Sequence, residues 1–464
     1  MNPFLYDFDL ARQTYLQDPF PTLTVRRDRI NRLLTMLNEN EENLCKVIQA
    51  DFHYRNTIET QLAEISMIRS AAKFNLKNLA KWTAKRKVIT PSYLRPSQSY
   101  IMPQPKGIVG IMSPWNYPLA LALIPVIAAF AAGNRVWLKP SERSARTSGY
   151  LAVLIQQYFH PSEFTIITGG PEISKHFSEL PFHHLLFTGS TQTGQLVAKA
   201  AAENLTPVTL ELGGKSPAII EASANLADAC SRIIYGKLFN AGQTCIAPDY
   251  LLVPHHLIDS CIKELQKSLL KQYPNDEGLT HPIDQNQLTR WQYLVQDAAQ
   301  RGCKTIPLAN EEWLKQFPFM PMLVLQPTSQ SAVMSEEIFG PILPILGYDK
   351  LQDAYDFIQQ RPNPLCIYYF GKSSESISQL LNQTKSGGVT LNDTLLHYSN
   401  PYLPFGGVGD SGMGSYHGKF GFDTFSHLKS VMTMKGFMGI KALGGTKMAH
   451  PPYGNRIKKL LKVL

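Results

Sequence analysis

From Lys106 onward, short apolar runs typical of strands alternate with helical stretches, and successive strands are about 30 residues apart, the length of one βαβ unit. The expected strands are 107–112, 134–139, 164–168, 184–189 and 207–212. After Gly213 the pattern resumes, with expected strands at 216–221, 250–254, 321–327 and 365–371. This alternation predicts an α/β protein with two doubly wound, mostly parallel sheets.

The N-terminal 85 residues differ, because apolar side chains recur there at helical spacing over 26–50 and 58–82. The segment 88–104 then mixes β-forming residues with prolines, which predicts an extended stretch at a sheet edge. The apolar run 119–133 is shorter than the roughly 20 residues of a membrane-spanning helix. We expect it to be a buried helix between two strands.

Charge and cysteine content narrow the classes of function. The formal net charge is +9, but the basic residues are spread along the chain and no nucleic-acid-binding module is recognisable, so we expect no nucleic-acid partner. The six cysteines form no CxxC pair, so we expect no metal site. The N-terminus lacks the pattern of a signal peptide, and we expect a cytoplasmic location.

Three motifs carry residues suited to carbonyl chemistry. FNAGQTC ends on Cys245, which follows small residues that permit a tight turn around a nucleophilic thiol. Glu211 ends an expected strand in LELGGKSP, where a carboxylate can act as a general base toward water. Asn116 in SPWNYP offers an amide donor to an oxyanion. Taken singly, such residues are more often a structural cysteine, a solvated charge at a strand end and a turn-forming asparagine, and the catalytic interpretation depends on their occurring together.

Two further motifs suit a nucleotide. WLKPSE follows a strand and carries Lys139 and Glu142, which can bind ribose hydroxyls or pair with phosphate. FTGSTQTG, residues 187–194, is a glycine–serine turn that opens a helix, and the N-terminus of a helix offers free N–H groups to phosphates. The motif EEIFGP at 336–341 has no chemistry of its own.

Together and in this order, these motifs resemble the aldehyde dehydrogenase superfamily. The resemblance runs from about residue 10 to the C-terminal tail. FNAGQTCIAPDY, the glycine-rich segment 404–427 and HPPYG at 450–454 are most similar to the class 3 branch and, within it, to the bacterial coniferyl aldehyde dehydrogenases. The resemblance implies the aldehyde dehydrogenase fold, with a β-arm for oligomerisation beside the two sheet domains.

The resemblance also implies a mechanism. Cys245 attacks the aldehyde, Asn116 stabilises the oxyanion of the thiohemiacetal, and Glu211 activates the water that hydrolyses the resulting thioester. The implied cofactor contacts are Lys139, Glu142, Gly189, Ser190, Gly194, Glu337 and Phe339. Glu142 favours NAD because its charge repels a 2′-phosphate, although the adjacent Arg143 leaves NADP open. Tyr117 and His397 are expected at the substrate entrance.

We expect the dinucleotide-binding domain to comprise 1–87 and 106–211, and the catalytic domain 212–388. The arm would comprise 88–105 and 389–428, followed by a tail, 429–464. A homodimer is expected from the class 3 resemblance. Ile457, Leu460, Leu461 and Leu464 lie at helical spacing among basic residues, so the tail is either a peripheral membrane contact or a surface-packed end.

Two alternatives differ in class from a hydrolytic dehydrogenase. An acylating enzyme would pass the thioester to coenzyme A or phosphate and would not need Glu211. A structural protein on the same scaffold, such as a lens crystallin, would not need Cys245. The substrate stays open between aromatic aldehydes such as coniferaldehyde and medium- or long-chain aliphatic ones.

Overall fold

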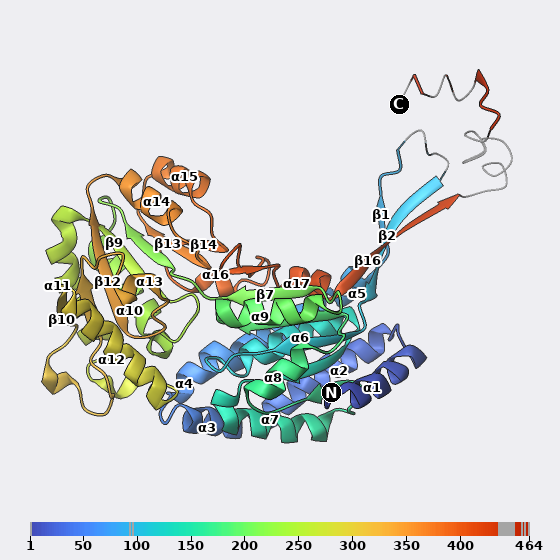
Figure 1. Ribbon diagram of the computed structural model, residues 1–464, viewed down its shortest axis with the longest axis horizontal. Coiled ribbons are helices and arrows are strands. Elements are labelled where there is room, and N and C mark those ends of the chain that lie inside the picture. Colours follow the sequence, from blue (N-terminus) through green and yellow to red (C-terminus); the bar gives the residue numbers. More distant parts are fainter. Residues whose placement is uncertain are drawn as a thin grey trace.

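The computed structural model of the chain describes residues 2–91, 94, 97–434, 451–455, 458, 461 and 462. Its strands form a seven-stranded, a six-stranded and a three-stranded sheet. Figure 1 shows them along one elongated molecule, with the three-stranded sheet projecting from the end opposite the seven-stranded one. The predicted α/β fold with two mostly parallel sheets is confirmed.

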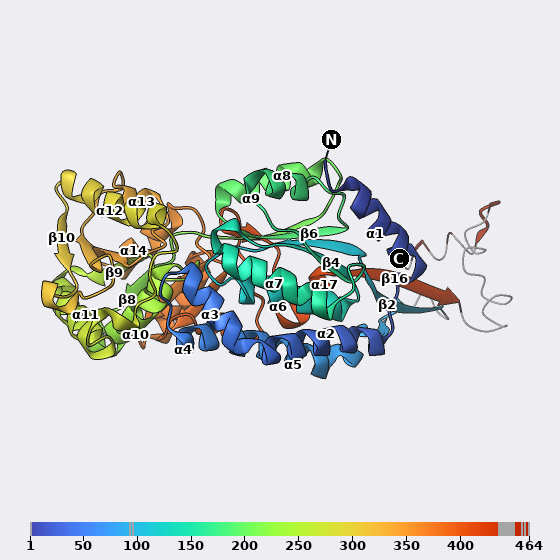
Figure 2. The same ribbon diagram turned by 90° about the horizontal axis from the view of Figure 1, so that it is seen from below.

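The six-stranded sheet has the order β15-β7-β6-β3-β4-β5 and is parallel except for β15. Figure 2 shows α8 and α9 on one side of its strands and α6 and α7 on the other. The chain leaves β3 toward β4 and later returns to β6, so the direction of winding reverses between β3 and β6, where such sheets bind ligands. Its elements are β3 (Ile108–Met112), α6 (Ala120–Ala132), β4 (Arg135–Lys139), α7 (Ala145–Tyr158), β5 (Phe164–Ile166), α8 (Pro171–Ser178), β6 (His184–Gly189), α9 (Thr191–Ala202), β7 (Val208–Leu212) and β15 (Gly412–Met413).

The seven-stranded sheet has the order β10-β11-β12-β9-β8-β13-β14, with only β10 antiparallel to its neighbour. Its strands are β8 (Pro217–Ile220), β9 (Tyr250–Pro254), β10 (Lys304–Pro307), β11 (Met322–Leu325), β12 (Ile342–Tyr348), β13 (Cys366–Phe370) and β14 (Gly388–Leu391). Its helices are α10 (Leu226–Leu238), α11 (Ile258–Gln272), α12 (Gln285–Gln300), α13 (Ala332–Ser335), α14 (Leu351–Gln359) and α15 (Ser374–Gln383).

β12 is a central strand that the sequence did not predict, because Pro344 lies within it. A proline cannot donate to a ladder and normally argues against a central strand. Here the ladder between β12 and β9 begins at Ile345, one residue after the proline, while Pro344 itself is paired only with Val324 on the other side. The missing N–H therefore falls outside the β9 ladder.

The expected N-terminal helices are present and the apolar run 119–133 forms α6, whose residues are all buried. The N-terminal elements are α1 (Leu5–Gln17), α2 (Leu23–Glu39), α3 (Glu41–Asp51), α4 (Thr57–Thr60), a π-helical turn (Gln61–Ile65) and α5 (Ser66–Thr83). In the part of the chain that the structure describes, none of the helices combines the length and apolarity that crossing a bilayer requires.

The projecting sheet consists of β1 (Arg86–Val88), β2 (Ser97–Pro105) and β16 (Ser426–Met434), all antiparallel. Residues 389–428, expected to join this arm, are divided: β14 belongs to the seven-stranded sheet and β15 to the six-stranded sheet. The short helix α16 (Leu396–Ser399) lies between these two strands, and α17 (Gly418–Thr424) lies between β15 and β16. The domain boundaries stay a prediction. Ile457, Leu460 and Leu464 of the expected tail helix lie outside the described residues.

Candidate active site

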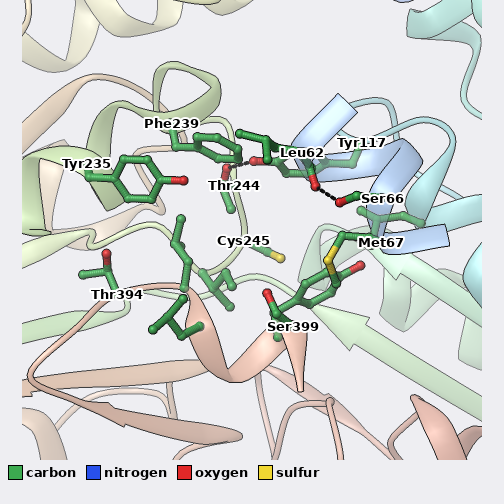
Figure 3. A pocket seen from close by; sticks show the side chains of 16 residues that line it. Leu62, Ser66, Met67, Tyr117, Tyr235, Phe239, Thr244, Cys245, Thr394 and Ser399 are labelled. Carbon is green, nitrogen blue, oxygen red and sulfur yellow. Dashed lines mark hydrogen bonds between the residues drawn. The ribbon is translucent and has the colours of Figure 1, made fainter. Parts of the chain in front are cut away.

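A cavity of about 320 Å³ opens beside Cys245 and has mainly apolar walls. Figure 3 shows the Cys245 sulfur pointing into it, with Tyr117 and Met67 on one side and Thr394 and Ser399 on another. The walls come from the π-helical turn with α5, the loop after β3, the end of α10 and the segment 394–399. Residues far apart in the sequence thus enclose one thiol.

A strained turn presents Cys245. Asn240, Ala241 and Gly242 all have positive φ, at 53°, 51° and 76°. Gly242 cannot be replaced without movement, because a Cβ atom there would lie 2.4 Å from the carbonyl oxygen of Gly340. Gln243 braces the turn by donating from Nε2 to the carbonyl oxygens of Asn240 and His281, each at 3.1 Å. Such strain persists only where the surroundings hold it, and it often marks a functional site.

Asn116 is joined directly to this turn. It follows β3 and is only 3% exposed, and its Nδ2 donates to the carbonyl oxygen of Gln243 at 3.1 Å. A second hydrogen bond runs in the opposite direction, because Asn240 donates from Nδ2 to the Asn116 carbonyl oxygen at 3.0 Å. A side-chain amide has two hydrogens, so the bond to Gln243 leaves one for a ligand.

Glu211 lies on β7 and is 1% exposed. Among the described residues, no group meets hydrogen-bond geometry with either of its carboxylate oxygens. Burial raises the pKa of Glu211 to about 7, although the nearby Cys245 and Thr188 lower it. Burial, and next the charge of Glu211, raise the pKa of the Cys245 thiol well above its usual value. In the protein without substrate the thiol therefore keeps its proton, while Glu211 changes its charge near neutral pH.

A larger groove of about 790 Å³ lies at the carboxyl ends of β3, β4 and β6. Lys139, Glu142, Gly189 and Ser190 all line it. Ser190 caps α9 by accepting from the backbone N–H of Thr193, while the helix start faces the groove. The volume suits a dinucleotide and the helix start suits its phosphates, so the residues fit the expected cofactor.

Lys139 and Glu142 are close together within this groove. The Lys139 Nζ is 2% exposed, donates to the Pro140 carbonyl at 2.8 Å and lies 3.7 Å from a Glu142 carboxylate oxygen. Burial lowers the pKa of Lys139. Arg143 also lines the groove, but its guanidinium is held by the Asp284 carboxylate at 2.8 Å and lies 4.4 Å from the Trp115 ring centre.

Glu337 and Phe339 approach from the seven-stranded half. The Glu337 carboxylate packs on Gly213, where an added Cβ would meet it at 2.0 Å. Burial, and next the charge of Asp249, raise the pKa of Glu337 to about 8. Phe339 has a φ of 49° and makes an edge contact with Trp115, with ring centres 5.3 Å apart. Trp115 lines the groove, so Phe339 borders its wall.

Gly194 and His397 line neither the cavity nor the groove, and the same is true of Asn116, Glu211, Glu337 and Phe339. Gly194 is buried in α9, where a Cβ would meet Leu212 at 2.6 Å, so its small size lets the helix pack on β7. The His397 Nδ1 bonds the Thr390 hydroxyl at 2.8 Å, and its neighbours Leu396 and Tyr398 line the cavity instead. Tyr117 does line the cavity, with its hydroxyl 2.6 Å from that of Thr244.

The sequence reasoning missed a buried charged cluster behind the Asn116 loop. Arg55 is fully buried, donates to the Glu64 carboxylate at 3.0 Å and to the Asn116 carbonyl at 3.3 Å, and lies 3.4 Å from Glu59. Glu64 accepts from the backbone N–H groups of Leu119 and Ala120, where α6 begins. These charges stand in a helical stretch with no motif, and the only signal was a set of ionisable residues inside an apolar pattern.

Comparison with known proteins agrees with this geometry. The model of the aldehyde dehydrogenase family matches residues 18–431. A probable coniferyl aldehyde dehydrogenase of Pseudomonas aeruginosa is 41% identical, over 98% of this chain and 94% of that protein. The substrate-bound state of an AldH from Staphylococcus aureus is 37% identical, with a TM-score of 0.92 and complete coverage of both chains. A betaine aldehyde dehydrogenase of Staphylococcus aureus in complex with NAD+ is 25% identical, with a TM-score of 0.80 over 91% of this chain and 86% of that one.

Proposed function

The chain belongs to the aldehyde dehydrogenase family, and from this premise we propose that it oxidises an aldehyde to the free carboxylic acid with Cys245 as the nucleophile and Glu211 as the base. The carrying observation is that Cys245, whose sulfur faces the apolar cavity, interacts directly with Glu211. The charge of Glu211 raises the pKa of the thiol, and the thiol lowers the pKa of Glu211. A thiol that must become a thiolate and a carboxylate that titrates near neutrality form a nucleophile and its base.

The reaction begins when Glu211 takes the thiol proton and the Cys245 sulfur attacks the aldehyde carbon. The second amide hydrogen of Asn116 and the backbone N–H of Cys245 then donate to the oxyanion of the thiohemiacetal. Losing one such donor lowers the rate by about 10²–10³-fold. Glu211 releases the thiol proton to solvent before hydrolysis begins. Once the thioester has formed, Glu211 removes a proton from water, and the water oxygen attacks the acyl carbon. The C–S bond then breaks, the acid leaves, and the Cys245 thiolate takes the proton back from Glu211.

The cofactor is NAD(P), which when bound accepts the hydride from the thiohemiacetal carbon. We assign the adenosine ribose to Lys139 and Glu142, the phosphates to Gly189, Ser190 and the start of α9, and the nicotinamide ribose to Glu337. The groove and the helix start support this assignment. Residues 1–87 and 106–211 would form the cofactor domain, and 212–388 would carry the nucleophile.

The buried base separates this proposal from the acylating alternative. An enzyme that transfers its acyl group to coenzyme A needs no group that activates water. Here Glu211 is held at the thiol with a pKa of about 7, the value that suits a general base at physiological pH. The direct interaction of Glu211 with a thiol that lines a cavity also argues against a purely structural role.

For the substrate we propose an aromatic aldehyde of the size of coniferaldehyde. Tyr117, Tyr235, Phe239 and Tyr398 supply aromatic walls, and hydroxyl groups such as that of Thr394 can bind a phenol. The name of the relative from Pseudomonas aeruginosa points the same way. A medium- or long-chain aliphatic aldehyde is the second candidate, because the lining residues Leu62 and Leu396 are 55% and 56% exposed.

Substrate choice is tested by comparing kcat/KM for coniferaldehyde, benzaldehyde, hexanal and hexadecanal. We expect coniferaldehyde to be preferred. A preference for hexadecanal by about tenfold or more, which is 1.4 kcal/mol of transition-state binding, would overturn the aromatic assignment.

The catalytic assignment is tested with two variants. Cys245→Ala should abolish NADH production while circular dichroism stays that of the parent. Glu211→Gln should give one burst of NADH followed by slow turnover, because water activation is lost. Full activity of Cys245→Ala would disprove the mechanism.

The proposal extends to a cytoplasmic homodimer. All six cysteines are unpaired, as a catalytic thiol in a reducing compartment requires. The projecting sheet ends on β16, an edge strand with exposed Leu428 and Met432, which a second copy would cover. Peripheral membrane contact through the basic tail is the weaker part of the proposal. Equal liposome binding by the full chain and by a truncation after residue 450 would remove it.

A further inference from the structure

Three buried polar side chains lie in a row across the ends of adjacent strands. Thr188 on β6 is paired with Glu211 on β7. Ser113 directly follows Met112, which is paired with Phe187, so Ser113 stands beside Thr188 on the other side. Paired residues of a parallel ladder point to the same face of the sheet. The hydroxyls of Ser113 and Thr188 therefore follow one another toward the Glu211 carboxylate.

The three side chains of this row are buried and, among the described residues, lack hydrogen-bond partners. Ser113, Thr188 and Glu211 are 6%, 5% and 1% exposed. Within the described part of the chain, Ser113 Oγ, Thr188 Oγ1 and both Glu211 oxygens have no partner in full hydrogen-bond geometry. Buried polar groups are almost always paired, so an unpaired set calls for an explanation. The Thr188 hydroxyl lowers the pKa of Glu211, so the carboxylate is near enough to be its acceptor.

We propose that Thr188 is a positioning residue for Glu211, and that its hydroxyl, supported by that of Ser113, holds the carboxylate oriented and ionised while the thioester is hydrolysed. This inference rests on the proposed role of Glu211 as the base. A hydrogen bond from a hydroxyl to a carboxylate favours the charged form, which burial otherwise disfavours. This contact already affects Glu211 in the protein without substrate. Burial raises the pKa of Glu211, and Cys245 and Thr188 lower it by a smaller amount.

Thr188 could instead have a purely structural role or contact the cofactor, and each of these roles predicts a different observation. As a purely structural residue it should bond a backbone group, as Thr206 bonds the Phe182 carbonyl at 2.9 Å, but no such bond is found for Thr188 among the described residues. As a cofactor contact it would act through the groove, which it and Ser113 also line. A cofactor contact should change the KM for NAD, whereas a partner of Glu211 should change how hydrolysis depends on pH.

The test is Thr188→Val, which keeps the shape and removes the hydroxyl. Rapid-mixing and steady-state NADH formation are measured across the acid side of the pH profile. We expect the burst to keep its amplitude, steady-state turnover at neutral pH to fall about tenfold, and the acid limb of kcat to move to higher pH by about one unit. Thr188→Ser should restore the parent profile, and Ser113→Ala should shift it less in the same direction.

Thr209→Val is the matched control, because Thr209 is also buried on β7 but its hydroxyl bonds His184 at 2.9 Å. Its pH profile should equal that of the parent. An unchanged acid limb in both Thr188→Val and Ser113→Ala, or a change confined to the KM for NAD, would overturn the inference. If Thr188→Val fails to fold, the acid limb of the kcat profile of Ser113→Ala decides whether the inference stands. Full turnover by Glu211→Gln would instead disprove the proposed base itself.

Discussion

Cys245 and Glu211 gain their chemistry from burial and from each other. A cysteine in a glycine-containing turn is, taken by itself, more often structural than catalytic. In the folded chain the thiol faces a cavity, and a carboxylate with a pKa of about 7 stands beside it. The residue types were visible in the sequence, but their proton affinities depend on distances and burial that only the fold sets.

The pH dependence of turnover follows from Glu211. Its pKa is raised from its ordinary value to about 7, so the base is protonated and inactive in acid and becomes ionised as the pH rises. We therefore expect kcat to increase through about pH 7 and to lose this limb in Glu211→Gln. Steady-state NADH formation in constant-ionic-strength buffers measures it. A rate that stays flat over this range in the parent enzyme would contradict the assignment.

Cofactor choice should depend on Glu142 and not on Arg143. The Glu142 carboxylate lines the groove and would repel a 2′-phosphate, while Arg143 is held by Asp284 and Trp115. Glu142→Gln should raise kcat/KM for NADP relative to NAD by about tenfold or more, because like charges in contact cost several kcal/mol. Arg143→Ala should leave NADP use unchanged. A loss of NADP use in Arg143→Ala would show that this arginine binds the phosphate.

Among the structural elements, the π-helical turn of residues 61–65 connects the N-terminal helices to the site. It carries Glu64 inward to the start of α6 and to Arg55, while Leu62 and Ala63 line the cavity. π-Helical turns are rare and frequently occur at functional sites. One local irregularity thus serves both the substrate wall and the support of the Asn116 loop.

Removing Arg55 should destabilise this support strongly. Arg55→Met would leave Glu59 and Glu64 buried without their cation, and breaking a buried pair typically costs about 3–5 kcal/mol. The free energy of unfolding from urea titration measures it. Arg69→Met is the control, because the Arg69–Glu41 pair is 33% and 24% exposed and should contribute about 0–1 kcal/mol. Equal losses in the two variants would contradict the role of the cluster.

The strands and helices differ in how well the sequence predicted them. Strands such as β6 and β7 were predicted because apolar and β-branched residues predominate in them, and the motifs at their ends placed Glu211 and Ser190 at the carboxyl ends of these strands. β12 was missed because it contains Pro344. The strand tolerates this proline because its ladder with β9 begins one residue later, at Ile345. His397 was expected at the entrance, but one turn of α16 directs its neighbours there instead. These outcomes depend on which residues of neighbouring strands are paired and on which side of a helix a residue lies. A short sequence motif specifies neither.

At the scale of the whole molecule, the projecting sheet exposes apolar side chains, and among the described residues one edge of it has no paired strand. β16 is paired on one side with β2 only, and Leu428, Met432 and Met434 on it are 44%, 51% and 36% exposed. An open edge of this kind invites pairing with another chain. Because the sheet stands away from the body in Figure 1, a second copy can reach it without displacing any helix.

We therefore expect Leu428→Lys combined with Met432→Glu to convert a dimer into a monomer, because charges placed on an edge oppose its pairing. Sedimentation velocity measures the change, with the parent chain expected at twice the 52.0 kDa of one copy. Leu196→Lys is the control, since Leu196 is 69% exposed on α9, away from the arm, and should leave the dimer intact. The Cys245 cavity is built within one chain, so the monomeric variant should keep the NADH burst of the parent. A parent chain that sediments as a monomer would refute the proposed dimer, and an arm variant that stays dimeric would place the interface elsewhere.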